Sequence, residues 1–190
     1  MYKAIIFDFF GVIQADPYQR WLSKRGLKRE GSFADIADAM DRGFITREDF
    51  FERLSELSDD TVENIRKTLY DEKFIDEELV KLISLLKQKY QIGLLSNSRG
   101  DYLRPILDKH GITQLFDEII ISSEVGIIKP DPAIFELALG RTGITAEQAI
   151  FIDDNETNAQ AAASIGIKSI WYKDLTSLKE KLADLGIRAS

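Results

Sequence analysis

The stretch that decides the fold stands near the start of the chain, where residues 4–9 read Ala-Ile-Ile-Phe-Asp-Phe and residues 10–12 read Phe-Gly-Val. A short run that is almost continuously apolar is typical of a strand buried on both faces, as in a parallel sheet. Asp8 falls at the end of this run. A single aspartate in that place is ordinarily a turn residue or a helix cap, so its meaning depends on the rest of the chain.

Similar apolar runs recur along the sequence and are separated by segments with helical periodicity. The runs lie at residues 92–95, 118–122 and 149–152, with a weaker one at 169–172, and the helical segments at 76–90, 102–110, 132–142 and 155–165. Strands that alternate with helices of this length indicate βαβ units. The sequence therefore predicts an α/β fold with a doubly wound, Rossmann-like parallel sheet.

One region breaks the alternation. Residues 17–70 contain helical patterns and no convincing strand, with helix starts at Asp16-Pro17 and at Thr46 and a further helix over 59–69. Such short helices need partners to bury their apolar stripes. We therefore expect an α/β core at residues 1–14 and 76–190, and an all-helical cap at 15–75 inserted after the first strand.

Composition narrows the possible functions. The chain has 190 residues, 44% of them hydrophobic, with 25 basic and 32 acidic side chains, a net charge of -7 and no cysteine. The acidic balance argues against nucleic-acid or membrane-surface binding, and the lack of cysteine excludes disulfides and thiolate chemistry. We expect a cytoplasmic protein, a monomer or homodimer, that acts on a small molecule.

Every major predicted strand is followed by polar side chains suited to one site. In chain order these are Asp8, then Ser96 and Asn97, then Lys129, then Asp153 and Asp154. Ligands of open parallel sheets bind at the carboxyl ends of the strands. Carboxylates suit Mg²⁺, for which Mn²⁺ could substitute, and an ammonium and a hydroxyl complete the groups needed for phosphoryl transfer with an aspartate nucleophile.

These segments resemble the four sequence motifs of the haloacid dehalogenase superfamily of hydrolases. The matching stretches are residues 5–13, 94–97, 126–132 and 151–158, and the likeness extends over nearly the whole chain, including a small helical cap of the C1 type. Within the superfamily the chain looks most like a subgroup of capped phosphatases that includes sugar-1-phosphate phosphatases.

The resemblance implies a role for each matching residue. Asp8 would be the nucleophile and a metal ligand, and the backbone carbonyl of Phe10 would be a second ligand. Ser96 and Asn97 would bind the phosphoryl oxygens, and Lys129 would neutralise the nucleophile and the phosphate.

The fourth motif would complete the metal site. Asp154 would supply its main carboxylate, and Asp153 would bind the metal directly or through water. Asn158 matches a position that is often acidic in relatives, and it would at most contact the metal ligands without binding the metal itself. In the cap, Arg42 is a candidate for substrate binding, although a plain turn explains the Arg42-Gly43 pair equally well.

One position departs from the superfamily pattern. Phosphatases of this kind usually carry a second aspartate, which moves a proton, two residues after the nucleophile, and here that residue is Phe10. We favour a phosphatase whose substrate has an easy leaving group or whose acid comes from elsewhere; Asp16 is near enough in sequence, but helix capping explains it better. The alternatives are a 2-haloacid dehalogenase, against which the Asp153-Asp154 pair argues, and a weakened catalyst with a binding role.

Overall fold

The computed structural model describes residues 1–70 and 75–188 and contains the predicted parallel sheet. Its strands are β1 (Ala4–Phe7), β2 (Gln91–Ser96), β3 (Glu118–Ile121), β4 (Ala149–Asp153) and β5 (Lys168–Trp171). They lie in the order β3-β2-β1-β4-β5, and each neighbouring pair is parallel. The predicted fold class is confirmed.

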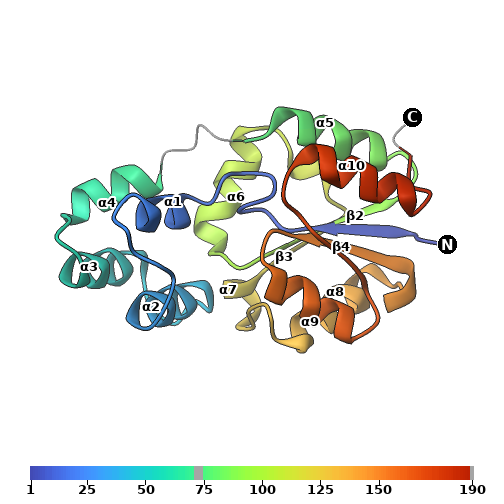
Figure 1. The fold of residues 1–190 in the computed structure, drawn as a ribbon. Helices are drawn as coiled ribbons and strands as arrows, with labels where there is room; N and C mark the ends of the chain where they lie inside the picture. The colour runs from blue at the N-terminus through green and yellow to red at the C-terminus, as the bar shows by residue number, and fades with distance from the viewer. Residues whose placement is uncertain (71–74, 189–190) are drawn as a thin grey trace.

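Helices cover both faces of the sheet (Figure 1). One face packs against α5 (Glu77–Leu86), α6 (Gly100–Lys109) and α10 (Leu175–Asp184), and the other against α8 (Pro132–Thr142) and α9 (Glu156–Ser164). Alternate residues of β1 serve the two faces: Ile5 and Phe7 join the first core cluster, and Ile6 joins the second. This two-residue period explains why the strand reads as continuously apolar.

The sequence prediction differs from the structure in detail. The helix expected over 76–90 ends at Leu86, because residues 87–90 form the turn that leads into β2. Neither α10 nor the short α7 (Ser122–Val125) was predicted. The remaining short elements are 3₁₀ turns at Thr113–Leu115 and Ala146–Gln148.

Helices are the only regular elements in the described part of the inserted region, residues 15–70. It contains α1 (Pro17–Ser23), α2 (Ser32–Asp41), α3 (Arg47–Leu57) and α4 (Val62–Leu69), which lie beyond one end of the sheet (Figure 1). Its buried side chains, among them Trp21, Phe51 and Leu54, form a cluster separate from the two clusters of the core. The region therefore has its own hydrophobic interior.

The chain enters and leaves the cap at neighbouring points. Gln14 pairs with Ile75 in an antiparallel bridge, and the N–H of Asp76 donates to the carbonyl of Ile13 at 2.9 Å. The predicted boundary at residues 75 and 76 falls beside residues 71–74, which lie outside the described residues, as do positions 189–190 of the predicted core. Within 1–70 and 75–188, no helix combines the length and apolar character needed to cross a membrane.

Candidate active site

The register of the sheet brings Asp8 beside Asp153. Phe7 pairs with Leu94 on one side and with Ile152 on the other, and the N–H of Asp8 donates to the carbonyl of Ile152 at 2.9 Å. Asp8 is therefore the first residue beyond β1, level with the end of β4. The backbone itself fixes the distance between these two carboxylates.

Lys129 lies between the two aspartates. Its Nζ is 2.8 Å from Oδ1 of Asp8 and 2.6 Å from Oδ2 of Asp153, and the lysine is only 3% exposed. Burial alone would lower the pKa of Lys129, but the charges of Asp153 and Asp8 hold it above its ordinary value. The lysine is thus a fixed positive charge in the floor of the site.

One ammonium group does not balance the carboxylates around it. Burial raises the pKa of Asp8 well above its ordinary value; Lys129 opposes the rise, and the charges of Asp153 and Asp154 add to it. Burial, followed by the charge of Asp153, also raises the pKa of Asp154 to about 6. A nucleophilic carboxylate must be ionised, so the site requires more positive charge than Lys129 supplies.

The same carboxylates fit a divalent cation. Asp8, Asp153 and Asp154 can each offer an oxygen such that these atoms lie within 4.8 Å of one another. Gly11 leaves room for Asp154, because a Cβ added at Gly11, whose φ is +86°, would overlap that carboxylate. Hard oxygen ligands clustered in this way suit Mg²⁺.

The two aspartates at the carboxyl end of β4, Asp153 within the strand and Asp154 after it, have different surroundings. Asp153 is 0% exposed, and its oxygens accept from Lys129, from the N–H of Asn155 at 2.8 Å and from Nδ2 of Asn158 at 3.1 and 3.2 Å. Asp154 lines the neighbouring cavity. Asp153 is thus placed to hold Lys129 in position, whereas Asp154 is accessible to a ligand.

Ser96 is the last residue of β2 and Asn97 follows it, and the two side chains have different environments. The Asn97 amide donates to the carbonyl of Lys129 at 2.9 Å and accepts from its N–H at 2.8 Å, so it fixes the backbone of the lysine. Ser96 is 0% exposed, and its Oγ has no hydrogen-bond partner among the described residues. A buried hydroxyl without a partner is costly, and a bound oxyanion or ion would satisfy it.

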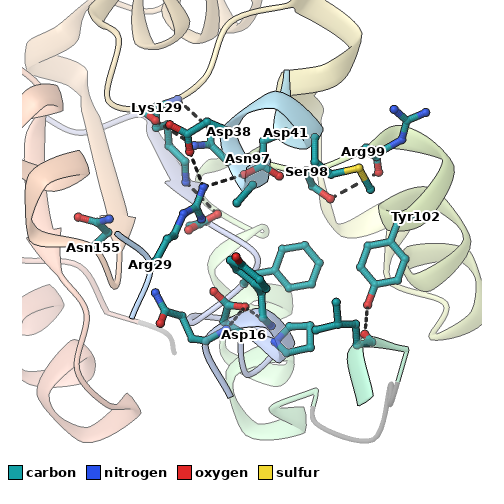
Figure 2. A pocket seen from close by; sticks show the side chains of 18 of the residues that line it. Asp16, Arg29, Asp38, Asp41, Asn97, Ser98, Arg99, Tyr102, Lys129 and Asn155 are labelled. Carbon is teal, nitrogen blue, oxygen red and sulfur yellow. Dashed lines mark hydrogen bonds and ion pairs between the residues drawn. The ribbon is translucent and has the colours of Figure 1, made fainter. Parts of the chain in front are cut away.

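The cavity above these groups lies between core and cap. It has a volume of about 350 Å³, and both Asp8 and Asp154 line it. Figure 2 shows it with Lys129 and Asn97 of the core on its wall. The side chain of Phe10 lines it as well and stacks on Tyr102 with their rings 5.9 Å apart and nearly parallel. Position 10, where the phosphatases that the sequence resembles usually have a second aspartate, is thus part of an aromatic wall of the cavity.

The cap contributes charged side chains to the same cavity. Arg29 donates to Asp38 at 2.7 Å and to Asp41 at 3.1 Å, and all three line the cavity together with Asp16 (Figure 2). Arg47 lines it as well. Neither the cap arginines Arg29 and Arg47 nor the two carboxylates bound by Arg29 were predicted as site residues, because the sequence of a short helix does not indicate which polar face turns toward the core.

Arg42, the predicted cap residue, is placed elsewhere. It caps the C-terminus of α2 and is absent from the residues that line the cavity within the described chain. Its neighbour Gly43 packs against Ser123, and Oγ of Ser122 donates to the carbonyl of Asp41 at 2.5 Å. The turn after α2 therefore forms a contact between cap and core.

Other residues also join cap and core close to the second motif. Nη1 of Arg99 donates to the carbonyl of Ile45 at 2.9 Å, and the hydroxyl of Tyr102 donates to the carbonyl of Leu69 at 2.7 Å. These bonds hold the cap over the end of the sheet in the present structure.

Comparison with known proteins identifies the family. Residues 2–166 match the haloacid dehalogenase-like hydrolases, and the chain belongs to this family. It is 31% identical over 210 residues to acyl-CoA dehydrogenase family member 10 of Mus musculus, which covers 97% of this chain and 19% of that protein. It is 36% identical over 81 residues to a phosphoserine phosphatase of Thermus thermophilus, which covers 42% of this chain and 32% of that protein.

Other similarities are more distant. An (S)-2-haloacid dehalogenase of a Pseudomonas species is 27% identical over 103 residues, covering 54% of this chain and 45% of that enzyme. The chain thus spans less than half the length of each of these curated relatives. Among solved structures, a haloacid dehalogenase family enzyme of Bacteroides thetaiotaomicron in complex with magnesium and inorganic phosphate superimposes with a TM-score of 0.70, at 21% identity over 94% of this chain and 99% of that chain. The chain therefore shares both the family and the fold of hydrolases.

Proposed function

We propose that this protein is a magnesium-dependent phosphomonoester hydrolase that acts through an aspartyl-phosphate at Asp8. The observation that carries the proposal is the buried arrangement of Asp8, Lys129 and Asp153 at the sheet edge, next to Asp154. Three carboxylates and one ammonium leave net negative charge, which a divalent cation would neutralise before a phosphate could enter.

Each residue of the site has a separate role in the proposed reaction. A carboxylate oxygen of Asp8 attacks phosphorus, the bond to the leaving oxygen breaks, and water later cleaves the acyl phosphate to restore Asp8. Lys129 stabilises the nucleophile and the transferred phosphoryl group, while the unpartnered hydroxyl of Ser96 can donate to a phosphoryl oxygen. Asn97 keeps Lys129 in place through its backbone.

The metal site would use Asp8, Asp154 and the carbonyl of Phe10, with Asp153 reached directly or through water. Bound there, Mg²⁺ would supply charge neutralisation for the phosphoryl group. A fold relative of this chain was solved with magnesium and inorganic phosphate, which supports both the metal and the reaction class.

The substrate is best described as a small phosphorylated metabolite. A cavity of about 350 Å³ enclosed by a cap accommodates a compound of sugar-phosphate size. Hydroxyl-rich substrates fit the paired carboxylates and guanidinium of Asp38, Asp41 and Arg29, which offer both acceptors and donors.

A 2-haloacid dehalogenase is the second candidate, favoured by the aromatic Phe10 and by the dehalogenase relative. Displacement of halide by Asp8 needs no cation, so it gives no reason for the excess of carboxylates over Lys129. A binding role without catalysis is the third, and it leaves the buried lysine between two aspartates unexplained.

Phosphate release from a panel of esters tests the proposal. Aryl, acyl and sugar-1-phosphates are compared with alkyl phosphates, with Mg²⁺ or EDTA, for wild type and Asp8→Asn. We expect release that requires Mg²⁺ and disappears in the variant. Halide release from 2-haloacids without phosphate release would favour the dehalogenase, and neither activity would favour the binding role.

A further inference from the structure

Phe10 cannot donate a proton, so the first motif provides no general acid for the leaving group of the substrate. Phe10 packs edge-to-face on Phe9 at 4.9 Å and stacks on Tyr102, so its ring is held in the cavity wall. An alkyl phosphate needs a proton on its departing oxygen, and general acid catalysis is typically worth about 10²–10⁴-fold. The source of that proton must lie elsewhere in the cavity.

Most carboxyl groups that line the cavity already have partners. Asp8 pairs with Lys129, and Asp38 and Asp41 both accept from Arg29. Asp154 belongs to the carboxylate cluster that fits a cation. These four groups are poorly placed to exchange a proton with a substrate.

Asp16 is the remaining carboxyl group among the described residues of the cavity wall. It stands on the segment that runs from the nucleophile into the cap, and it faces the cavity from below Arg29 (Figure 2). Its Oδ1 accepts from the N–H groups of Tyr18 at 2.8 Å and Gln19 at 3.1 Å and so caps α1. In the described chain no hydrogen bond or ion pair engages Oδ2, which leaves one oxygen for a proton.

The surroundings of Asp16 favour a carboxyl group that can hold a proton. Burial raises the pKa of Asp16. The two backbone N–H groups and the charge of Arg29 lower it, but they do not cancel the effect of burial. Asp154 lines the same cavity, and the negative charge of Asp16 contributes to the raised pKa of Asp154.

We propose that Asp16 is the general acid and base of the phosphatase reaction, supplied by the entry to the cap in place of the side chain at position 10. This proposal rests on the proposed function. While Asp8 attacks phosphorus and the ester P–O bond breaks, the carboxyl proton of Asp16 passes to the leaving oxygen and releases an alcohol. The Asp16 carboxylate then takes a proton from the water that attacks the aspartyl-phosphate, the P–O bond to Asp8 breaks, and phosphate leaves with both aspartates restored.

Asp16→Asn separates this role from helix capping. Asparagine caps a helix about as well as aspartate, so α1 stays intact while the proton is lost. Asp76→Asn is the matched control, because Oδ1 of Asp76 likewise accepts from two backbone N–H groups, those of Glu78 and Leu79, at 3.0 Å each, at the start of a helix of the core.

The test measures kcat/KM with Mg²⁺ on an alkyl phosphate and on p-nitrophenyl phosphate, whose leaving group needs no proton. For Asp16→Asn we expect a loss of about 10²–10⁴-fold on the alkyl ester and less than tenfold on the aryl ester, with an unchanged melting temperature. Asp76→Asn should match wild type on both esters.

Two results overturn the assignment of Asp16 while leaving the phosphatase itself standing. In the first, the Asp16→Asn variant is as active as wild type on the alkyl ester. In the second, Asp16→Asn loses the same factor of kcat/KM on both esters. In both cases Asp8→Asn abolishes phosphate release. A wild type that releases phosphate from neither ester, or an Asp8→Asn variant that remains active, instead overturns the proposed function and the role of Asp16 with it.

Discussion

Replacing Lys129 by methionine tests the charge balance of the site directly. Methionine keeps the apolar length of the side chain and removes the ammonium group that lies 2.8 Å from Asp8 and 2.6 Å from Asp153. Removing one partner of a buried ion pair typically lowers the free energy of unfolding by about 3–5 kcal/mol, because the remaining charge is left uncompensated. Since two buried carboxylates lose the same partner, we expect a loss of unfolding free energy near the upper end, about 5 kcal/mol.

The assay is urea unfolding at pH 7 in EDTA and again in saturating Mg²⁺. Ligand at 100 times its Kd stabilises a folded protein by about 2.7 kcal/mol, and the gain should be larger in Lys129→Met, because the bound cation then has no neighbouring ammonium to repel it. Lys81→Met is the control: Lys81 forms an ion pair with Glu78 at the similar distance of 2.7 Å, but both side chains are about two-thirds exposed. We expect no measurable change there, because solvent screens such a pair.

A Lys129→Met protein within about 1 kcal/mol of wild type in EDTA would refute this reasoning, because that is the scale of an exposed pair. A loss of several kcal/mol that Mg²⁺ does not relieve would show that the lysine stabilises the fold without sharing a cation site. The two measurements therefore separate the structural role of the lysine from its place in a metal centre.

Two further predictions concern the cavity. Gly11→Ala should weaken Mg²⁺ binding at least tenfold in titration calorimetry, because the new Cβ would overlap Asp154. Gly26 also has a positive φ but open space around it, so Gly26→Ala should cost only backbone strain, about 1 kcal/mol of unfolding free energy, and should leave Mg²⁺ binding unchanged. Equal Mg²⁺ binding in both variants would contradict the prediction for Gly11. Burial raises the pKa of Asp41 to about 6, so the folded state binds this proton more tightly than the unfolded state, and the contribution is present at low pH and lost as pH rises through 6. The unfolding free energy of wild type relative to Asp41→Asn should thus be roughly 1 kcal/mol greater at pH 5 than at pH 7 in urea titrations, and a difference that does not vary with pH would contradict it.

The core could be predicted from the sequence because its signals are local. Buried strands such as Ala4–Phe7 are apolar along their whole length, and helices such as α8 and α9 begin at recognisable caps, Asp131 and Asn155. In a parallel sheet the ends of such strands must meet, so the order of polar residues along the chain already places Asp8 near Asp153. The α10 helix was missed although it carries local signals of the same kind, since Asp174 caps its start and its buried residues, Leu178 and Leu182, are spaced by one turn.

The details of the site could not be read in the same way. The sequence places Asn97 next to Ser96, but only the structure shows that its amide bonds to the backbone of Lys129. The cap residues Arg29 and Asp41 are 12 positions apart, and their pairing depends on how α2 packs over the sheet edge. Neither contact leaves a periodic or compositional signal, so the chemistry of the cap emerges only from tertiary structure.

The arrangement of the cavity bears on why Phe10 can be tolerated beside a nucleophile. The charged groups next to the nucleophile lie at the sheet edge, while Phe10, Tyr102 and Tyr70 form a continuous aromatic wall, with the ring centroids of Tyr70 and Tyr102 5.2 Å apart. An apolar wall lowers the local dielectric, which strengthens the attraction of Lys129 for a transferring phosphoryl group. A side chain that cannot move a proton thus still serves the reaction, provided that the proton comes from the cap. If Asp16 is its source, the acid stands at the point where the chain enters the cap, and catalysis on poor leaving groups then requires the cap to be in the position that Arg99 and Ser122 hold.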